Sequence, residues 1–243
     1  MWRTLLVGAC CLLVADGCSS VDSTKIRTGG LRAAIAVTVA EGGSGAQVEV
    51  TLNVGTLTYV KLGKADSLVA TSATSSVRLR KSTVLGNIAY LGKLDGVRAA
   101  GTVVTIAFKR GPDDTSAPNS TVALAAPVHM SNPSAGATFS RSHDTVTVSI
   151  DGGAAPGAIT VGWAGPCVLG GSIDVAPGYS SVSIAAHSIV ARPASSPTGP
   201  TRADSCPLTL TTTRQTEGHL DPAYGSGAIY GRATSTRQII STP

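Results

Sequence analysis

Aromatic and charged residues are scarce in this sequence. Phe, Trp and Tyr together make up 4% of the 243 residues, and Asp, Glu, Lys and Arg together make up 14%. Because charged helix formers such as Glu and Lys are few, the composition suits many short strands and turns better than packed helices. Apolar residues nevertheless reach 42%, which is too many for a disordered chain. The composition therefore predicts a folded chain of the all-β class.

Short catalytic and nucleotide-binding motifs are also missing. The sequence contains no G-x-S-x-G, G-x-G-x-x-G, phosphate loop, H-E-x-x-H or EF-hand pattern. Ser142, His143 and Asp144 have the residue types of a nucleophilic triad, but neighbours along a strand point to opposite faces and cannot form the relay. His219 and Asp221 share one side of an extended segment, yet no third group is evident. We expect no enzyme, no cofactor and no metal site.

Alternation of apolar and polar residues runs through the whole chain after its first 30 residues. Apolar residues at every second position are typical of half-buried strands. Gly-rich turn signals such as 41–45 and 151–153 separate these runs. The clearest runs are Val48, Val50, Leu52 and Val54, then Val104, Ile106 and Phe108, then Val146, Val148 and Ile150.

The main break in composition lies at 111–120, a polar, turn-rich stretch with two prolines. The segments on either side are each close to the roughly 100 residues of an immunoglobulin-like module. We therefore expect two tandem Ig-like antiparallel β-sandwich modules, at 31–110 and 126–243. Residues 111–125 would form a linker and joining strand.

The amino terminus has the three-part layout of a secretory signal peptide. A basic start at Arg3 is followed by an apolar run, 5–15, and by small residues before Cys18. The run is shorter than the roughly 20 residues that a transmembrane helix needs. The pattern predicts export and removal of residues 1–17.

At Gly17 and Cys18 the segment resembles the lipobox of bacterial lipoproteins, in which a small residue precedes the cysteine that becomes acylated. This resemblance implies a lipid anchor on Cys18, a tether at 18–30, and a position in the bacterial cell envelope. Ser19 and Ser20 resemble the residues that direct such proteins to the outer membrane in some bacteria. The alternative is an ordinary cleaved signal in which Cys18 is incidental.

Cys167 and Cys206 are the cysteines that remain for the mature body, because Cys10 and Cys11 lie in the presumed signal and Cys18 is the expected lipid site. In an oxidising compartment the two can pair, closing a long loop. The alternative is two unpaired buried thiols. A metal site is disfavoured because neither has a second Cys or His at ligand spacing.

Arg78, Arg80 and Lys81 form the tightest basic group in a chain of net charge +5. As a surface patch they could contact anionic lipid headgroups or a polyanionic wall polymer. They could equally be a solvated face. Stacking aromatic residues are absent from the group, so the sequence gives no support for nucleic-acid binding.

Several diffuse motifs in the second half carry a further resemblance. Segments 116–120, 140–142, 206–210 and 214–224 look like the pattern of uncharacterised bacterial lipoproteins with Ig-like or fibronectin-like modules. The resemblance implies location and fold, and no functional residue. The favoured hypothesis is a noncatalytic, membrane-anchored scaffold or binding module for an envelope protein or glycan. The alternative is a secreted hydrolase or carbohydrate-binding accessory protein with a site around His219, Asp221 and Trp163.

Overall fold

The computed structural model describes residues 20–56, 58–84, 86–112, 114–152, 155–193 and 205–243. Strands and loops make up almost all of this part of the chain. The helical elements in it are two single turns of 3-10 helix, η1 (Ser23–Lys25) and η2 (Thr28–Gly30). The prediction of an all-β fold is confirmed. The signal peptide and Cys18 lie outside the described residues, so the export and lipidation hypotheses stay predictions.

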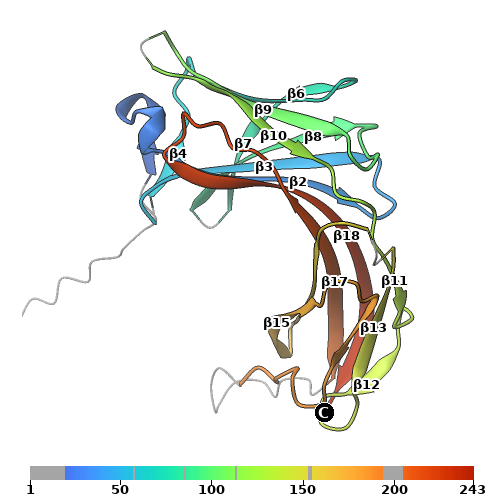
Figure 1. Ribbon diagram of the computed structural model, residues 1–243. Coiled ribbons are helices and arrows are strands. Elements are labelled where there is room, and N and C mark those ends of the chain that lie inside the picture. Colours follow the sequence, from blue (N-terminus) through green and yellow to red (C-terminus); the bar gives the residue numbers. More distant parts are fainter. Residues whose placement is uncertain (1–19, 57, 85, 113, 153–154, 194–204) are drawn as a thin grey trace, which may run out of the picture.

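One large sheet, called the shared sheet below, runs through the whole molecule (Figure 1). Its main path follows the order β1-β4-β3-β2-β18-β17-β14-β15, while β7, β8 and β12 pair alongside. Its strands are β1 (Ser20–Asp22), β2 (Arg32–Ala40), β3 (Gly45–Val54), β4 (Thr58–Lys61), β7 (Arg80–Val84), β8 (Asn87–Asp95), β12 (Thr138–Ser140), β14 (Ala158–Gly165), β15 (Val168–Val175), β17 (Cys206–Glu217) and β18 (Ser226–Thr242).

Two smaller antiparallel sheets pack against the shared sheet. The four-stranded sheet has the order β10-β9-β5-β6, and the three-stranded sheet has the order β11-β13-β16. Their strands are β5 (Ser67–Thr71), β6 (Ser76–Arg78), β9 (Val103–Lys109), β10 (Ala117–Ala123), β11 (His129–Asn132), β13 (Val146–Asp151) and β16 (Ser181–Ile184).

Two separate hydrophobic cores lie on the same face of the shared sheet. The first core takes buried apolar side chains from β2 to β5, β8 to β10 and the start of β18; the second takes them from β11 to β17 and the end of β18. Along β18, Ile229 belongs to the first core, and Ala233 and Ile239 belong to the second. Because these positions are separated by even numbers of residues, their side chains leave the strand on one side. We call the parts around these cores the first half and the second half.

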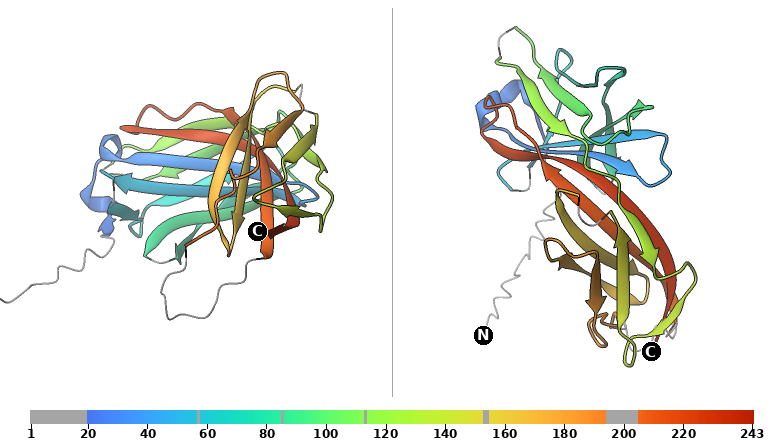
Figure 2. Two further views of the ribbon diagram at one scale, coloured as in Figure 1. Left: turned by 90° about the horizontal axis from the view of Figure 1, so that it is seen from below. Right: turned by 45° about the vertical axis from the view of Figure 1, so that its right-hand side comes forward.

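Figures 1 and 2 show β17 and β18 bending continuously from the first half into the second. The strand β17 pairs with β18 over its whole length, from Cys206 opposite Ser241 to Glu217 opposite Tyr230. In the first half β18 also pairs in parallel with β2, and near its end it pairs in parallel with β12. The two halves are therefore joined by hydrogen-bonded strands as well as by the chain between them.

Residues 111–125, expected to form a linker and joining strand, contain the strand β10. This strand forms the edge of the four-stranded sheet, where it pairs with β9. Ala117, Val122 and Leu124 are buried in the first core, as are Tyr224 and Ile229 from near the carboxyl end of the sequence. The physical reason is that the first core needs apolar cover from segments that are distant in the sequence.

Residues 20–30, expected to be part of a tether, pack against the first half. The strand β1 pairs in parallel with β4, with Ser20 opposite Tyr59 and Asp22 opposite Lys61. Ser23 is fully buried, and its hydroxyl donates a 2.6 Å hydrogen bond to Asp66. This segment therefore has a fixed place from Ser20 onward.

Cys167 and Cys206 form the predicted disulfide, with their Cα atoms 5.9 Å apart. Cys167 follows β14, and Cys206 begins β17. Both are buried in the second core. The bridge thus joins the β14–β15 turn to the strand that runs through both halves.

Candidate functional site

A basic cavity of about 350 Å³ lies at one edge of the first half. Four exposed cationic side chains line it: Lys61 from the end of β4, Lys64 from the β4–β5 connection, Arg78 from the end of β6, and Lys81 from β7. Like charges repel one another, so their convergence favours binding of an anion. We call this site the basic cavity.

The segment that carries Lys61 and Lys64 is held in place by hydrogen bonds. The backbone N–H of Leu62 donates to the Tyr90 hydroxyl at 2.8 Å, and the N–H of Gly63 donates to Ser23 Oγ at 2.7 Å. A side chain at Gly63 would meet the Thr24 methyl at 2.6 Å, so the Thr24 side chain would have to shift to accommodate it. The two lysines therefore project from a backbone that is already fixed.

Asp66 also lines the cavity, but its charge is engaged elsewhere. Its carboxylate lies 3.5 Å from Arg110 Nε and accepts hydrogen bonds from Ser23 Oγ and from the N–H of Gly111. Only 3% of the Asp66 side chain is exposed. Among the described residues, the ion pairs found do not include the four cavity cations. Lys61 still interacts with the charge of Asp22, which lies opposite it on β1, and Lys64, Arg78 and Lys81 are exposed.

The predicted basic group is divided by the fold. Arg78 ends β6, in the four-stranded sheet, whereas Arg80 begins β7, in the shared sheet. Leu79 lies buried between them, so the chain changes sheets at this residue. Arg78 and Lys81 line the basic cavity, and Arg80 is not among the residues around it. Sequence reasoning missed Lys61 and Lys64, whose one available signal was their position in the polar turn after an alternating strand.

Burial raises the pKa of Tyr90, which lies at the base of the cavity. Its hydroxyl donates to the carbonyl of Val60 at 3.0 Å and accepts from Leu62 N–H. These bonds use its donor, so Tyr90 acts as a structural support of the β4–β5 connection. The chemistry that the cavity offers is electrostatic attraction and hydrogen-bond donation to an anion.

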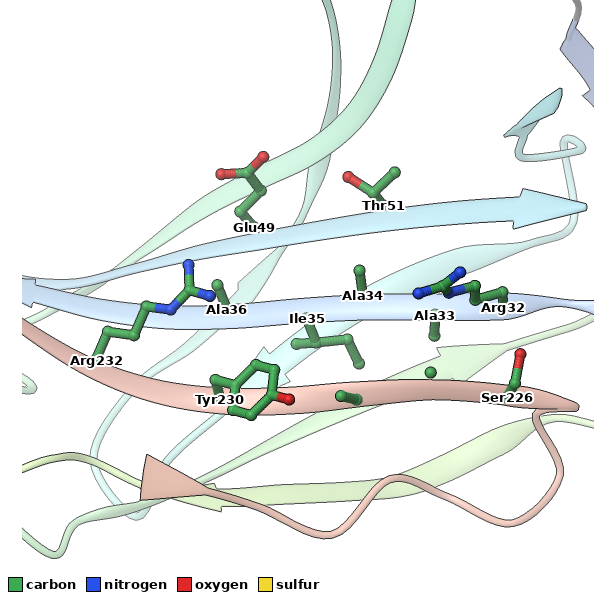
Figure 3. Close-up of a pocket in the computed structure, with 12 residues that line it drawn as sticks. Arg32, Ala33, Ala34, Ile35, Ala36, Glu49, Thr51, Ser226, Tyr230 and Arg232 are labelled. Carbon is green, nitrogen blue, oxygen red and sulfur yellow. The ribbon is translucent and has the colours of Figure 1, made fainter. Parts of the chain in front are cut away.

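A second depression, called the groove below, crosses the outer face of the shared sheet (Figure 3). It has a volume of about 550 Å³, and alanines of β2 and β18 form part of its lining. Figure 3 shows Arg32 near one end and Arg232 near the other, with Glu49 and Thr51 on β3 and Tyr230 on β18. Arg232 lies over the Tyr230 ring at 5.7 Å and donates to Gln215 at 2.9 Å. The groove therefore combines small apolar residues with fixed polar groups.

A third cavity, of about 420 Å³, lies where the two halves meet. Glu41, in the turn between β2 and β3, contacts Nδ1 of His129 and accepts a 2.6 Å hydrogen bond from the Ser235 hydroxyl. The hydrogen bond from Ser235, and then that from His129, hold the pKa of Glu41 below its ordinary value. A nucleophilic serine needs the imidazole between itself and the carboxylate, but here the carboxylate is in the middle. The trio is therefore a bridge between the halves.

His219, Asp221 and Trp163 do not assemble into one site. Trp163 lies opposite Leu210 in the β14–β17 pairing, and His219 follows Leu210 by nine residues along an extended segment. That separation corresponds to about 30 Å. Asp221 is buried and accepts hydrogen bonds from the N–H groups of Asn119 and Ala223. The suggested site around these residues therefore loses its geometric basis.

The described residues lack both a cluster of metal ligands and a membrane-spanning helix. In that part of the chain, no group of three or more His, Cys, Asp or Glu residues is placed to hold a metal ion. Over the same ranges, no helix has the length and apolar character required to cross a membrane.

Comparisons with known proteins give a likeness to solved structures. No protein-family model matches the chain, and no curated protein sequence matches it. Among solved structures, the chain is similar to the crystal structure of chicken CNTN1 FN1-FN3 domains, with 11% identity and a TM-score of 0.28. The alignment covers 88% of this chain and 69% of that chain.

Proposed function

We propose that this chain is a noncatalytic protein of the bacterial cell envelope, anchored through lipidated Cys18, that acts as a scaffold and binding module. The observation that supports it best is the shared sheet, which joins two cores and leaves its outer face free for a partner. Strands that cross both halves hold a fixed geometry better than a flexible linker would. This suits a scaffold that presents one continuous surface.

The groove is the part of that surface best suited to a partner. Its small alanine side chains allow close approach, while Arg32, Arg232 and Tyr230 supply hydrogen bonds and a ring face. Elsewhere on the same face, threonines of β17 and β18 such as Thr211, Thr213 and Thr234 remain half-buried. These groups fit an envelope protein or a glycan, and no catalytic relay lies among them.

A crosslinking experiment tests the binding role. A photoreactive amino acid replaces Ala34, on the groove, and in a matched control it replaces Val103, which is 56% exposed on β9 in the other sheet. Irradiation of cells should give a defined adduct from position 34 and none from position 103. Equal adducts at both positions, or none at either, would count against a binding role for the groove.

The anchor is tested separately by the intact mass of the mature protein. We expect cleavage before Cys18, the added mass of acyl chains, and loss of membrane association in the Cys18→Ser variant. Recovery of the full-length precursor from the cytosol would overturn the envelope assignment.

A further inference from the structure

The basic cavity lies beside the point where the chain would leave its lipid anchor. Asp22 of β1 is directly opposite Lys61 of β4 in the parallel pairing. Cys18 precedes Asp22 by four residues in the sequence, a span of at most about 14 Å. A lipid on Cys18 would therefore bring the cavity close to the headgroup layer.

The positive charge at this edge extends beyond the cavity. Lys25, at the end of η1, and Arg27 follow the strand β1 and add to Lys61, Lys64, Arg78 and Lys81. Three carboxylates lie nearby. Asp22 accepts the N–H of Thr24, a bond that holds the pKa of Asp22 below its ordinary value, and the charges of Lys61 and Lys25 lower it further, so Asp22 offsets part of the positive charge. Asp66 and Asp114 both pair with Arg110, the latter at 2.7 Å.

We propose that this edge is a docking surface for anionic lipid headgroups of the membrane that carries the Cys18 anchor. The proposal rests on the lipidation proposed above and adds a second contact to it. A single acyl anchor leaves a protein free to rotate on the bilayer, whereas an adjacent cluster of cations binds anionic lipid and limits the rotation. The lysines at the end of β4 and in the fixed β4–β5 connection meet the phosphate groups, and the cavity between them accepts one headgroup.

Docking in this way would orient the whole molecule. The strands β1 and β4 lie at one end of the first half, and the second half extends from the opposite end (Figure 1). With the basic edge on the membrane, the second half projects outward and the groove stands near the surface. A soluble phosphate in the cavity would not orient the molecule on the membrane. The expected ligand is therefore the phosphate of a lipid headgroup.

Vesicle binding by the chain without its lipid tests this directly. The mature chain from residue 18 carries Cys18→Ser, so that acylation makes no contribution. It should bind vesicles that contain phosphatidylglycerol, bind pure phosphatidylcholine vesicles far less, and lose binding as salt is added.

Two double variants with the same change in net charge show whether vesicle binding depends on the basic cavity or on the net charge of the protein. The variant K64Q/K81Q removes two exposed cations of the cavity, and K93Q/R98Q removes two exposed cations at the other end of the first half. At about fivefold for each cation near an anionic surface, the first variant should bind about 25-fold more weakly and the second less than threefold more weakly. If K64Q/K81Q lowers the thermal midpoint, the single variant K64Q replaces it, with K93Q as its control.

Three results would overturn the proposal: equal losses in both variants, no loss in K64Q/K81Q, or tighter binding to soluble polyphosphate than to the vesicles. Failure here is distinct from failure of the proposed function. An unmodified Cys18 in the mass measurement would remove the anchor and leave the vesicle result standing, whereas acylated Cys18 with no vesicle binding would remove only the docking surface.

Discussion

The two cores are closed at their ends by different chemistry. In the first half, the fully buried Arg110 pairs with Asp66 and Asp114, lies over the Phe108 ring at 5.4 Å, and donates to the carbonyls of Ser23 and Ile26. In the second half, the Cys167–Cys206 disulfide joins the β14–β15 turn covalently to β17. The first half thus fixes its loops with a buried cluster of charged side chains, whereas the second half uses a covalent cross-link. Loss of one charged partner should destabilise the first half, and reduction of the disulfide should destabilise the second.

Between these two closures, a third device holds the junction. The guanidinium of Arg214, on β17, is fully buried and donates to the carbonyls of Ala126, Pro127 and Gly152. Desolvation lowers the pKa of Arg214. In the described structure it has no carboxylate among these partners, so it differs from Arg110. It acts by satisfying backbone carbonyls of the segment that passes from one half to the other.

Removal of the disulfide should have the largest effect. The variant C167S/C206S frees a loop with a sequence separation of 39 residues, and the chain-entropy estimate is a loss of about 4 kcal/mol. Urea unfolding followed by the fluorescence of Trp163, which packs against the second core, reports the change. Reduction of the unmodified protein should shift the midpoint equally. Identical midpoints with and without reductant would contradict the role assigned to the bridge.

The next largest effect is expected from Asp66→Asn in the first half. This change leaves Arg110 buried without its more buried partner, and breaking such a pair costs about 3 kcal/mol. The control is Asp114→Asn, because the Asp114 side chain is 25% exposed and solvent screens its pairing with Arg110. Circular dichroism during urea unfolding should show a larger loss for Asp66→Asn than for Asp114→Asn. The reverse order would show that the buried pair is not what closes the first half.

A smaller effect is expected at the junction. Arg214→Met removes the donors from three carbonyls but also removes a desolvated charge, so the net loss should be about 2 kcal/mol. Arg214→Lys keeps the charge but supplies fewer donors. Its free energy of unfolding should therefore lie between those of the unmodified protein and Arg214→Met. Comparison of the Trp163 fluorescence midpoint with the circular dichroism midpoint measures whether the halves still unfold together. Unchanged stability in Arg214→Met would argue against the carbonyl contacts as a stabilising element.

The smallest effect concerns pH and the Glu41 bridge. Since the Ser235 and His129 hydrogen bonds lower the pKa of Glu41, its stabilisation is complete above the ordinary glutamate pKa of 4.5. This stabilisation is lost as the pH falls through the lower pKa that Glu41 has in the folded protein. Glu41→Gln should therefore cost about 0.5 kcal/mol at neutral pH and less in acid, because the pair is partly exposed. If the two proteins differed in free energy of unfolding by the same amount at every acid pH, the Glu41 carboxylate would not be the source of the stabilisation.

Much of the fold could be predicted because half-buried strands leave a local signal. The alternation at Val48 to Val54 corresponds to β3, and that at Val146 to Ile150 corresponds to β13. The disulfide was also predictable, since it needs only two available cysteines in an oxidising compartment. The parallel pairing of β18 with β2 was not, because alternation shows which face of a strand is buried and says nothing about its neighbour.

The candidate site was predictable only in part. Arg78 and Lys81 were recognisable as a basic group, whereas Lys61 and Lys64 come from another segment and join them only through folding. The groove had no sequence signal, since its alanines and arginines come from β2, β3 and β18. Charge density along a chain is local, but a binding surface collects residues from separate strands.

The sequence by itself determined that this chain forms strands, which side of each strand is buried, and which two cysteines of the body can pair. Only the tertiary structure decided that both cores lie on one shared sheet, that residues 117–124 complete the first core, and that four cations meet at one edge. The physical reason is that side-chain alternation is fixed by the backbone of a single strand, whereas strand order is chosen by how distant segments together remove apolar surface from water.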